Sequence, residues 1–178
     1  EICKVDASVG VVMSVNNSLV CWAIESFGND EQKEKFLRPL ATGEKLGAFC
    51  LSEPEAGSDA TQQHTSAALE NGNWVINGTK NWITNGTTAD VYLVMAQTDR
   101  YKKHKGITCF IVERDRQGFE PGLKEDKLGI RSSDTCSIGL TNVTVPPENI
   151  LGEAGRGFNI AMEVLNGGRI GIAAQALG

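Results

Sequence analysis

The chain has 178 residues, of which 40% are hydrophobic and 22% charged, and its formal net charge is -5. This composition is typical of a globular protein and excludes a disordered chain. The acidic balance argues against nucleic-acid binding, and the one basic cluster, at residues 100–105, is expected to be a solvated loop tip rather than a polyanion site.

Neither end of the chain resembles a natural terminus. Residue 1 is Glu1 rather than Met, no signal peptide follows it, and residues 173–178 have the pattern of a helix interior. We therefore expect an internal fragment of a longer protein. No apolar run approaches the roughly 20 residues that a membrane span needs, so we expect no membrane association.

Five cysteines are present, an odd number without the spacing of a metal site: Cys3, Cys21, Cys50, Cys109 and Cys136. Reduced, buried thiols are the expected state. They point to a cytoplasmic location in a bacterium or to the mitochondrial matrix in a eukaryote.

Three helical segments are predicted. Residues 7 to about 27 are apolar, and their length without a turn favours a buried helix over a strand. Gly28 and Asn29 predict a stop, and Asp30 with the acidic residues after it predicts the cap of a second helix that ends at Gly43. Apolar residues recur at helical spacing from Phe158 onward, which predicts a long third helix.

Between these helices the pattern changes to short strands. Residues 74–76 are predicted to meet residues 80–83 across a turn at Asn77 and Gly78, and Asn85 with Gly86 marks a second turn. Further strand-like runs cover residues 91–95, 107–112 and 138–145, each bounded by turn residues. The spacing is that of an antiparallel all-β unit, closed by Pro146 and Pro147.

Two strand ends carry hydroxyl groups and backbone amides that suit a planar, hydrogen-bonding ring. They are Phe49, Cys50, Leu51 and Ser52 in the first segment, and Trp82, Ile83 and Thr84 in the second. With residues 127–131, 150–153 and 168–178, which follow in the same order, these segments resemble the acyl-CoA dehydrogenase family.

The resemblance implies an α+β fold, in which a central antiparallel, β-barrel-like middle domain is flanked by helices from truncated N- and C-terminal helical domains. Residues 1–45 would end the first helical domain, residues 46–150 would form the middle domain that binds flavin and acyl-CoA, and residues 151–178 would begin the last domain. Residues 124–131 and 168–170 are most similar to short-chain, butyryl-type members.

The resemblance also implies roles for individual residues. FAD would contact the two segments named above, with the Ser52 hydroxyl at the pyrimidine edge and the Thr84 hydroxyl near N5. Acyl-CoA would contact Ser58 and the helical residues Asn166, Gly167, Gly168 and Arg169. Each has a structural alternative: a capped strand end at Ser52, a buried ring at Trp82, a polar turn at Ser58, and a helix-packing ion pair at Arg169.

No residue of this chain is assigned as the catalytic base. Some relatives carry it directly before the arginine, where this chain has Gly168, and others carry it in a later helix. Glu53 belongs to a motif whose family counterpart is structural. His64 and His104 lack partners for a triad or a metal, and no metal site is expected.

The implied function is oxidation of a short-chain acyl-CoA to the trans-2-enoyl-CoA, with electrons passing to an electron-transfer flavoprotein and with the full-length protein forming a homo-oligomer. Two alternatives remain open at this point: an acyl-CoA oxidase-like flavoenzyme that reacts with oxygen, and a non-catalytic CoA-binding module.

Overall fold

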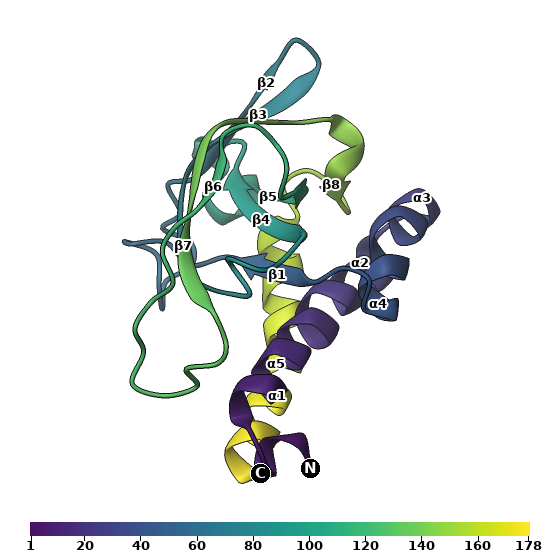
Figure 1. Cartoon of the computed structure of the whole chain (residues 1–178). Helices are drawn as coiled ribbons and strands as arrows, with labels where there is room; N and C mark the ends of the chain where they lie inside the picture. Colours follow the sequence, from purple (N-terminus) through teal and green to yellow (C-terminus); the bar gives the residue numbers. More distant parts are fainter.

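The computed structural model describes all 178 residues as a group of helices packed beside a single eight-stranded sheet (Figure 1). The main helical elements are α1 (Ala7–Ser14), η2 (Val15–Cys21), α2 (Trp22–Phe27), α3 (Asp30–Gln32), η3 (Lys33–Leu37), α4 (Arg38–Thr42) and α5 (Gly157–Leu177). Short 3-10 turns are η1 (Ile2–Lys4), η4 (Arg100–Gly106) and η5 (Pro147–Asn149). The strands are β1 (Gly47–Cys50), β2 (Ser66–Glu70), β3 (Asn73–Thr84), β4 (Val91–Gln97), β5 (Ile107–Glu113), β6 (Phe119–Pro121), β7 (Thr135–Val145) and β8 (Ile150–Leu151).

The predicted first helix is confirmed, as α1, η2 and α2 follow one another without a break. Asp6 caps it, because its carboxylate accepts a hydrogen bond from the Ser8 amide at 2.7 Å. The middle portion, η2, has π-helical hydrogen bonds. The helix is only partly buried, since Val9, Met13 and Trp22 are exposed.

By length and composition, the helix Ala7–Phe27 could cross a membrane, with a mean hydropathy of 1.5. The expectation that no apolar run approaches that length was therefore wrong. In this structure η2 packs on β1 and α5, and 39% of the apolar window is buried. A buried core helix of a soluble protein meets the same criterion.

The second helical stretch covers α3, η3 and α4, as predicted, but it begins one residue earlier than expected. Its cap is Asn29 rather than Asp30: Asn29 accepts from the Gln32 amide, and the Gln32 side chain accepts from the Asn29 amide. Gly43 ends the stretch with φ at 79°, a left-handed conformation that glycine adopts without strain.

The sheet has the strand order β6-β7-β3-β2-β4-β5-β8, with β1 paired to β4 at one side. Most pairs are antiparallel, as predicted, but β1 runs parallel to β4, and β2 meets β4 through one parallel pair. No pairing joins β6 to β8, so the sheet is open. The barrel-like form of the expected domain is therefore not confirmed.

The predicted hairpin turn at Asn77 and Gly78 is wrong. Both residues lie inside β3, a continuous strand of 12 residues that pairs with β2 on one side and with β7 on the other. The turn lies earlier, at Asn71 and Gly72, whose φ angles are 49° and 82°. The second predicted turn, at Asn85 and Gly86, is present.

Two hydrophobic cores, each of 17 buried residues, lie on the two faces of β4 and β5. The first joins the helices to the sheet through residues such as Ile24, Phe36 and Leu93, and the second fills the space between strands around Tyr92 and Phe110. All five cysteines are free, as expected, although Cys3 and Cys21 are only half-buried.

The predicted long helix is α5, which runs beneath the sheet and then alongside α1, so that both ends of the chain lie close together (Figure 1). The buried residues of α5, among them Ile160, Ala161 and Val164, lie in its first half, whereas Ile170, Ile172 and Leu177 in the second half are exposed.

Candidate functional site

The two segments that the sequence identified lie side by side. β1 continues into Leu51 and Ser52, and the Ser52 carbonyl accepts a hydrogen bond from the Asn81 amide of β3 at 2.8 Å. The Lys80 ammonium donates to the Leu51 carbonyl at 3.3 Å. The segment that ends at Ser52 is thereby fixed on β3, three residues before Thr84.

A β-bulge directs the second segment. The register between β3 and β7 shifts between Lys80 and Ile83, and Trp82 inside the shift has φ at 60°. Left-handed backbone is unfavourable for a bulky residue, and such outliers cluster at functional sites. The bulge leaves the Trp82 side chain 66% exposed, while Ile83 is buried and Thr84 half-buried. Residues 1–178 therefore do not bury the Trp82 ring.

The first segment offers little besides its backbone and one hydroxyl. Phe49 and Leu51 belong to the helix-side core, and Cys50 belongs to the opposite core. Burial raises the pKa of the Cys50 thiol to about 12, so this thiol is not a nucleophile at neutral pH. Ser52 is half-buried, and its hydroxyl takes part in none of the hydrogen bonds inside the chain.

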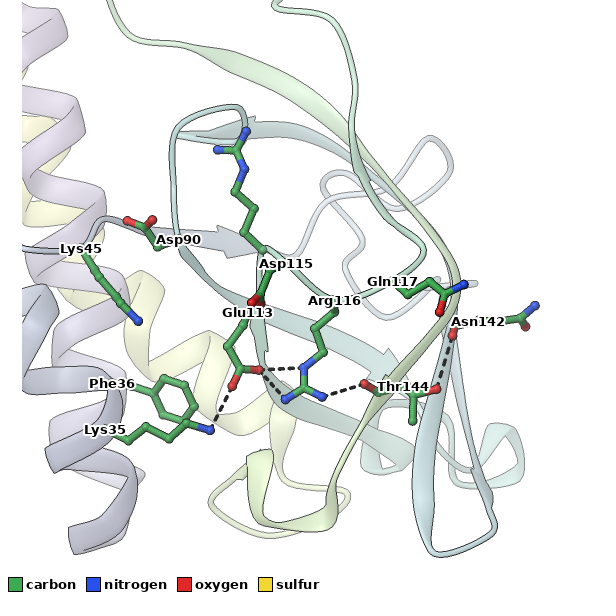
Figure 2. Close-up of a pocket in the computed structure, with 11 residues that line it drawn as sticks. Lys35, Phe36, Lys45, Asp90, Glu113, Asp115, Arg116, Gln117, Asn142 and Thr144 are labelled. Carbon is green, nitrogen blue, oxygen red and sulfur yellow. Dashed lines mark hydrogen bonds and ion pairs between the residues drawn. The ribbon is translucent and has the colours of Figure 1, made fainter.

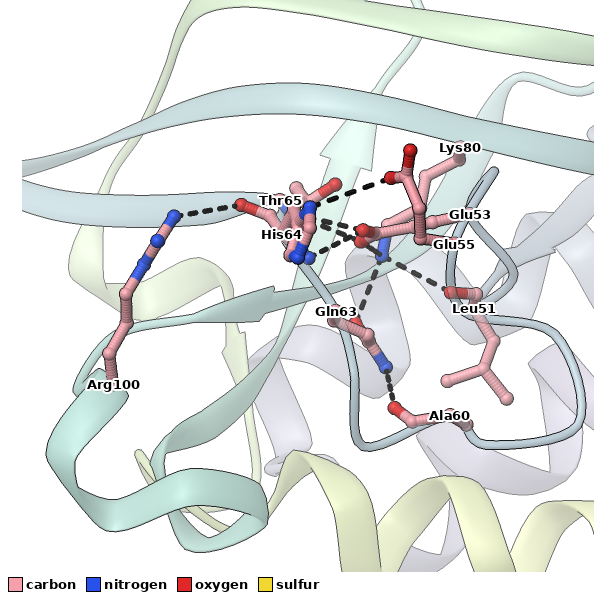
Figure 3. Close-up of polar contacts among 9 residues, drawn as sticks. All are labelled: Leu51, Glu53, Glu55, Ala60, Gln63, His64, Thr65, Lys80 and Arg100. Carbon is pink, nitrogen blue, oxygen red and sulfur yellow. Dashed lines mark hydrogen bonds and ion pairs between the residues drawn. The ribbon is translucent and has the colours of Figure 1, made fainter.

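Behind this segment lies a buried ion pair (Figure 3). Lys80 Nζ lies 2.7 Å from Glu53 Oε1 and donates to Gln63 Oε1 at 3.0 Å, and both charged side chains are almost wholly buried. Glu53 also accepts from the amides of His64 and Thr65. Burial alone would raise the pKa of Glu53, but the Lys80 charge and these hydrogen bonds outweigh it and hold that pKa below its ordinary value. The geometry therefore supports a structural role for Glu53, and not that of a free base.

Four of the five residues expected to contact acyl-CoA are exposed, and Gly168 is half-buried. Ser58 lies in the loop after Glu53, next to Asp59, whose carboxylate accepts from the amide and hydroxyl of Thr61. On α5, the Arg169 guanidinium donates to Asn166 Oδ1 at 2.6 Å, and none of the ion pairs within residues 1–178 includes it. No contact joins Ser58 to Arg169, so their convergence on one ligand stays a prediction.

Gly167 and Gly168 make the middle of α5 narrow. A side chain at Gly167 would meet nothing within 4 Å, whereas one at Gly168 would lie 2.9 Å from Leu19 Cδ2 of η2. Gly168 therefore allows α5 to pack closely on η2, and Gly167 leaves an open backbone surface that a ligand can approach.

A cavity of about 920 Å³ lies elsewhere, between the second helical stretch and the sheet (Figure 2). Phe36 is the one hydrophobic residue of its lining, and an ion network joins Lys35, Glu113 and Arg116 across it. This lining offers a single hydrophobic side chain to pack against the face of a planar ring, so the two strand ends remain the better candidate site.

Several residues that organise the site could not be identified from the sequence. Asp134 accepts from the amide and hydroxyl of Thr87 and from the Thr88 hydroxyl, which holds the turn directly after Thr84. Lys127 donates to the hydroxyl of Thr135, the residue opposite Thr84 in the β3–β7 register. Lys127 lies in one of the motifs that carried the resemblance, but the motif gives no indication of this partner.

Comparisons with known proteins agree with this architecture. Residues 48–143 match the acyl-CoA dehydrogenase middle domain, and residues 1–44 match the acyl-CoA dehydrogenase N-terminal domain. A short-chain specific acyl-CoA dehydrogenase of Clostridium acetobutylicum is 51% identical over 178 residues, which are 100% of this chain and 47% of that protein.

Two solved structures are also similar. The butyryl-CoA dehydrogenase of Megasphaera elsdenii superimposes with a TM-score of 0.98 at 52% identity, over 99% of this chain and 46% of that one. A structure described as the electron transferring flavoprotein of Acidaminococcus fermentans, in work on flavin-based electron bifurcation, has a TM-score of 0.97 at 48% identity, over 98% of this chain and 46% of the other.

The chain belongs to the acyl-CoA dehydrogenase family, whose members depend on FAD. It spans just under half the length of the relatives that it matches.

Proposed function

We propose that this chain is the flavin-binding part of an FAD-dependent acyl-CoA dehydrogenase that oxidises short-chain acyl-CoA to trans-2-enoyl-CoA. The observation that carries the proposal is the hydrogen bond between Asn81 and Ser52, which holds the Ser52 segment on β3 three residues before Thr84. The 51% identity to a short-chain specific relative supports the short-chain substrate class.

The residues present fit a flavin ring. Ser52 and Thr84 are half-buried hydroxyls at adjacent strand ends, with neither engaged by the protein, and Trp82 offers an exposed aromatic surface beside them. Bound FAD would supply the oxidising chemistry by accepting a hydride. The chain's own donors would hold the ring and stabilise the negative charge that reduction brings, as preorganised donors do at an oxyanion site.

The same proposal assigns the substrate surface and the missing base. Ser58 and the segment of Asn166, Gly167, Gly168 and Arg169 would contact the acyl-CoA, with Arg169 orienting a carboxylate or bonding to the substrate. Gly168 has no side chain to take the α-proton. The base would therefore come from a part of the full protein outside residues 1–178.

The proposed partners follow from the relatives. An electron-transfer flavoprotein would accept the electrons, which the similarity to the Acidaminococcus fermentans structure supports. The full-length protein would form a homo-oligomer, in the cytoplasm of a bacterium or in a mitochondrial matrix. Rapid reoxidation by oxygen in place of a flavoprotein would identify an acyl-CoA oxidase-like enzyme instead.

The proposal is tested with Thr84→Val and Ser52→Ala in the full-length protein, with Thr79→Val as control because Thr79 is an exposed hydroxyl of the same strand. A hydrogen bond of this kind contributes about 0.5–1.5 kcal/mol, and more at a developing charge. We expect both site variants to lower the flavin reduction potential and to slow reduction by butyryl-CoA, with the control unchanged. Unaltered spectra, potential and reduction rate in both would remove the assignment.

A further inference from the structure

A lysine without an acidic partner lies next to the proposed flavin site. Lys127, in the loop between β6 and β7, is half-buried, and its ammonium donates to the Ser133 carbonyl and, at 2.7 Å, to Thr135 Oγ1. None of the ion pairs of the structure includes it. Of the acidic residues near it, Asp126 pairs with Arg131 at 2.6 Å, and Asp134 binds the hydroxyls of the turn after β3. Glu125 lies two residues before Lys127, and its carboxylate forms no ion pair with Lys127.

The register of the sheet connects this ammonium to the site. Thr135 of β7 is the direct partner of Thr84 of β3, and residues opposite each other in an antiparallel pair have Cβ atoms about 4.5–5.5 Å apart on one face. The adjacent pair, Ile83 and Cys136, points into the opposite core. Thr84 and Thr135 therefore share the face opposite that core, where Thr84 is half-buried and Thr135 is buried. The Thr135 side chain thus lies between the Lys127 ammonium and Thr84.

The direction of the hydrogen bond gives Thr135 a specific property. Because its oxygen accepts from Lys127, its own hydroxyl proton is free to point toward a ligand on the face that it shares with Thr84. Hydrogen bonds that involve a charged group are stronger than neutral ones, and an ammonium polarises the hydroxyl that it contacts. The arrangement supplies both a positive charge and a second donor beside Thr84.

We propose that Lys127, acting through Thr135, is a positioning residue that raises the reduction potential of the bound flavin by placing an unneutralised positive charge beside the Thr84 end of the site. The inference rests on the proposed function, since it presupposes a flavin at Thr84. Hydride transfer brings two electrons and one proton to the ring, so reduction adds negative charge, which a nearby cation stabilises most where water is partly excluded.

A merely structural role would be to hold the loop on β7 through Ser133 and Thr135. That role would affect stability but not potential, so the two can be separated. The test uses full-length holoenzyme carrying Lys127→Met, Lys127→Arg and Thr135→Val. Lys124→Met is the matched control, because Lys124 is an exposed lysine of the same loop that forms no hydrogen bond or ion pair. The measurements are flavin content, thermal stability, and midpoint potential at low and high salt.

We expect Lys127→Met to lower the equilibrium constant for two-electron reduction about tenfold, which is a fall of about 30 mV in midpoint potential. Lys127→Arg should keep a midpoint potential close to that of the wild type, because the positive charge remains. Thr135→Val should lower the potential in the same direction, and Lys124→Met should leave it unchanged. High salt should narrow the Lys127→Met difference only slightly, since partly buried charges are weakly screened.

An unchanged potential in Lys127→Met protein that retains its flavin would overturn the inference. If that variant loses flavin or does not fold, Thr135→Val decides, and an unchanged potential there overturns the inference equally. A wild-type protein that binds no FAD would overturn the proposed function itself. By contrast, an effect of Thr84→Val without any effect of Lys127→Met or Thr135→Val would remove this inference alone.

Discussion

Lys80 is a cation buried in a β-sheet, and its contacts explain how the two strand ends of the candidate site are held together. It bonds to the Leu51 carbonyl, the Glu53 carboxylate and the Gln63 amide oxygen, so all three of its donors are used (Figure 3). Burial lowers the pKa of Lys80, and the Glu53 charge opposes that shift. The pair is tied to β3 directly before Asn81, whose amide binds Ser52.

Replacing Lys80 by Met is therefore expected to destabilise the protein strongly. Removing one partner of a buried ion pair leaves an uncompensated charge, which costs about 3–5 kcal/mol of unfolding free energy. Glu53→Gln combined with Lys80→Met should recover much of this loss, because a neutral amide oxygen still accepts from the His64 and Thr65 amides. Urea unfolding measures the free energy of unfolding of the single and the double variant.

The matched control for that experiment is Lys45→Met, because Lys45 is exposed and has no ion-pair partner. Its effect should stay within about 0.5 kcal/mol. A Lys80→Met protein as stable as the control would show that the Glu53 pair is not what holds the Ser52 segment on β3.

At the scale of single elements, β3 carries the second half of the site, and a glycine near its middle, Gly78, allows the strand to pass close to Thr65. Gly78 has φ at 152°, and a Cβ there would lie 2.4 Å from Thr65 Oγ1 and 2.6 Å from Thr65 Cα. Thr65 Cα is a backbone atom, so it cannot move aside as the end of a flexible side chain could. The register with β7 also shifts between Ile76 and Gly78.

We predict that Gly78→Ala destabilises the protein by about 2–4 kcal/mol, from overpacking and from backbone strain together. Gly72→Ala is the control, because Gly72 also has a positive φ, of 82°, but a Cβ there would meet nothing within 4 Å. The control should therefore lose only about 1 kcal/mol. Equal losses in chemical denaturation of the two variants would contradict the role of the Thr65 contact.

The sequence predicted most elements but not the course of β3. Runs of β-branched and aromatic residues identified β4, β5 and β7, and helical spacing identified α5. Asn77 and Gly78 have the composition of a hairpin turn, yet the strand continues because β2 and β7 supply partners along its length. Local propensity gives no information on such partners, since Val145 of β7, which pairs with Trp74, lies 71 residues further along the chain.

The same limit applies to the site. The Ser52 and Thr84 segments could be found because their motifs are contiguous in sequence. The Glu53–Lys80 pair and the Lys127–Thr135 contact depend on loop conformation and on strand register, which no short motif encodes. The exposure of Trp82 depends on a bulge, and neither Lys80 nor Asn81 in the sequence indicates one.

For the molecule as a whole, three partly or wholly buried carboxylates make folding sensitive to acid. Burial tends to raise the pKa values of Glu53, Glu113 and Asp134, but ion pairs and hydrogen bonds outweigh burial and hold each pKa below its ordinary value. Glu113 binds Lys35 at 2.9 Å and Arg116 at 2.7 Å, which joins the second helical stretch to β5 (Figure 2). The three groups thus stabilise three different parts of the fold.

We predict that the free energy of unfolding falls steadily as the pH drops below about 5, because the unfolded chain binds protons before the folded one does. The stabilisation is complete above the ordinary carboxylate pKa values of 4.5 for Glu and 3.8 for Asp, and it is lost as the pH falls through the lower, folded-state values. Glu113→Gln should lower stability at neutral pH and reduce its slope with pH in acid, whereas Glu70→Gln, at an exposed site on β2, should change neither. Urea unfolding across this pH range provides the measurement. The prediction fails if the unfolding free energy changes with pH in acid as steeply as in the wild type in all three variants Glu53→Gln, Glu113→Gln and Asp134→Asn. Other carboxylates would then control the stability.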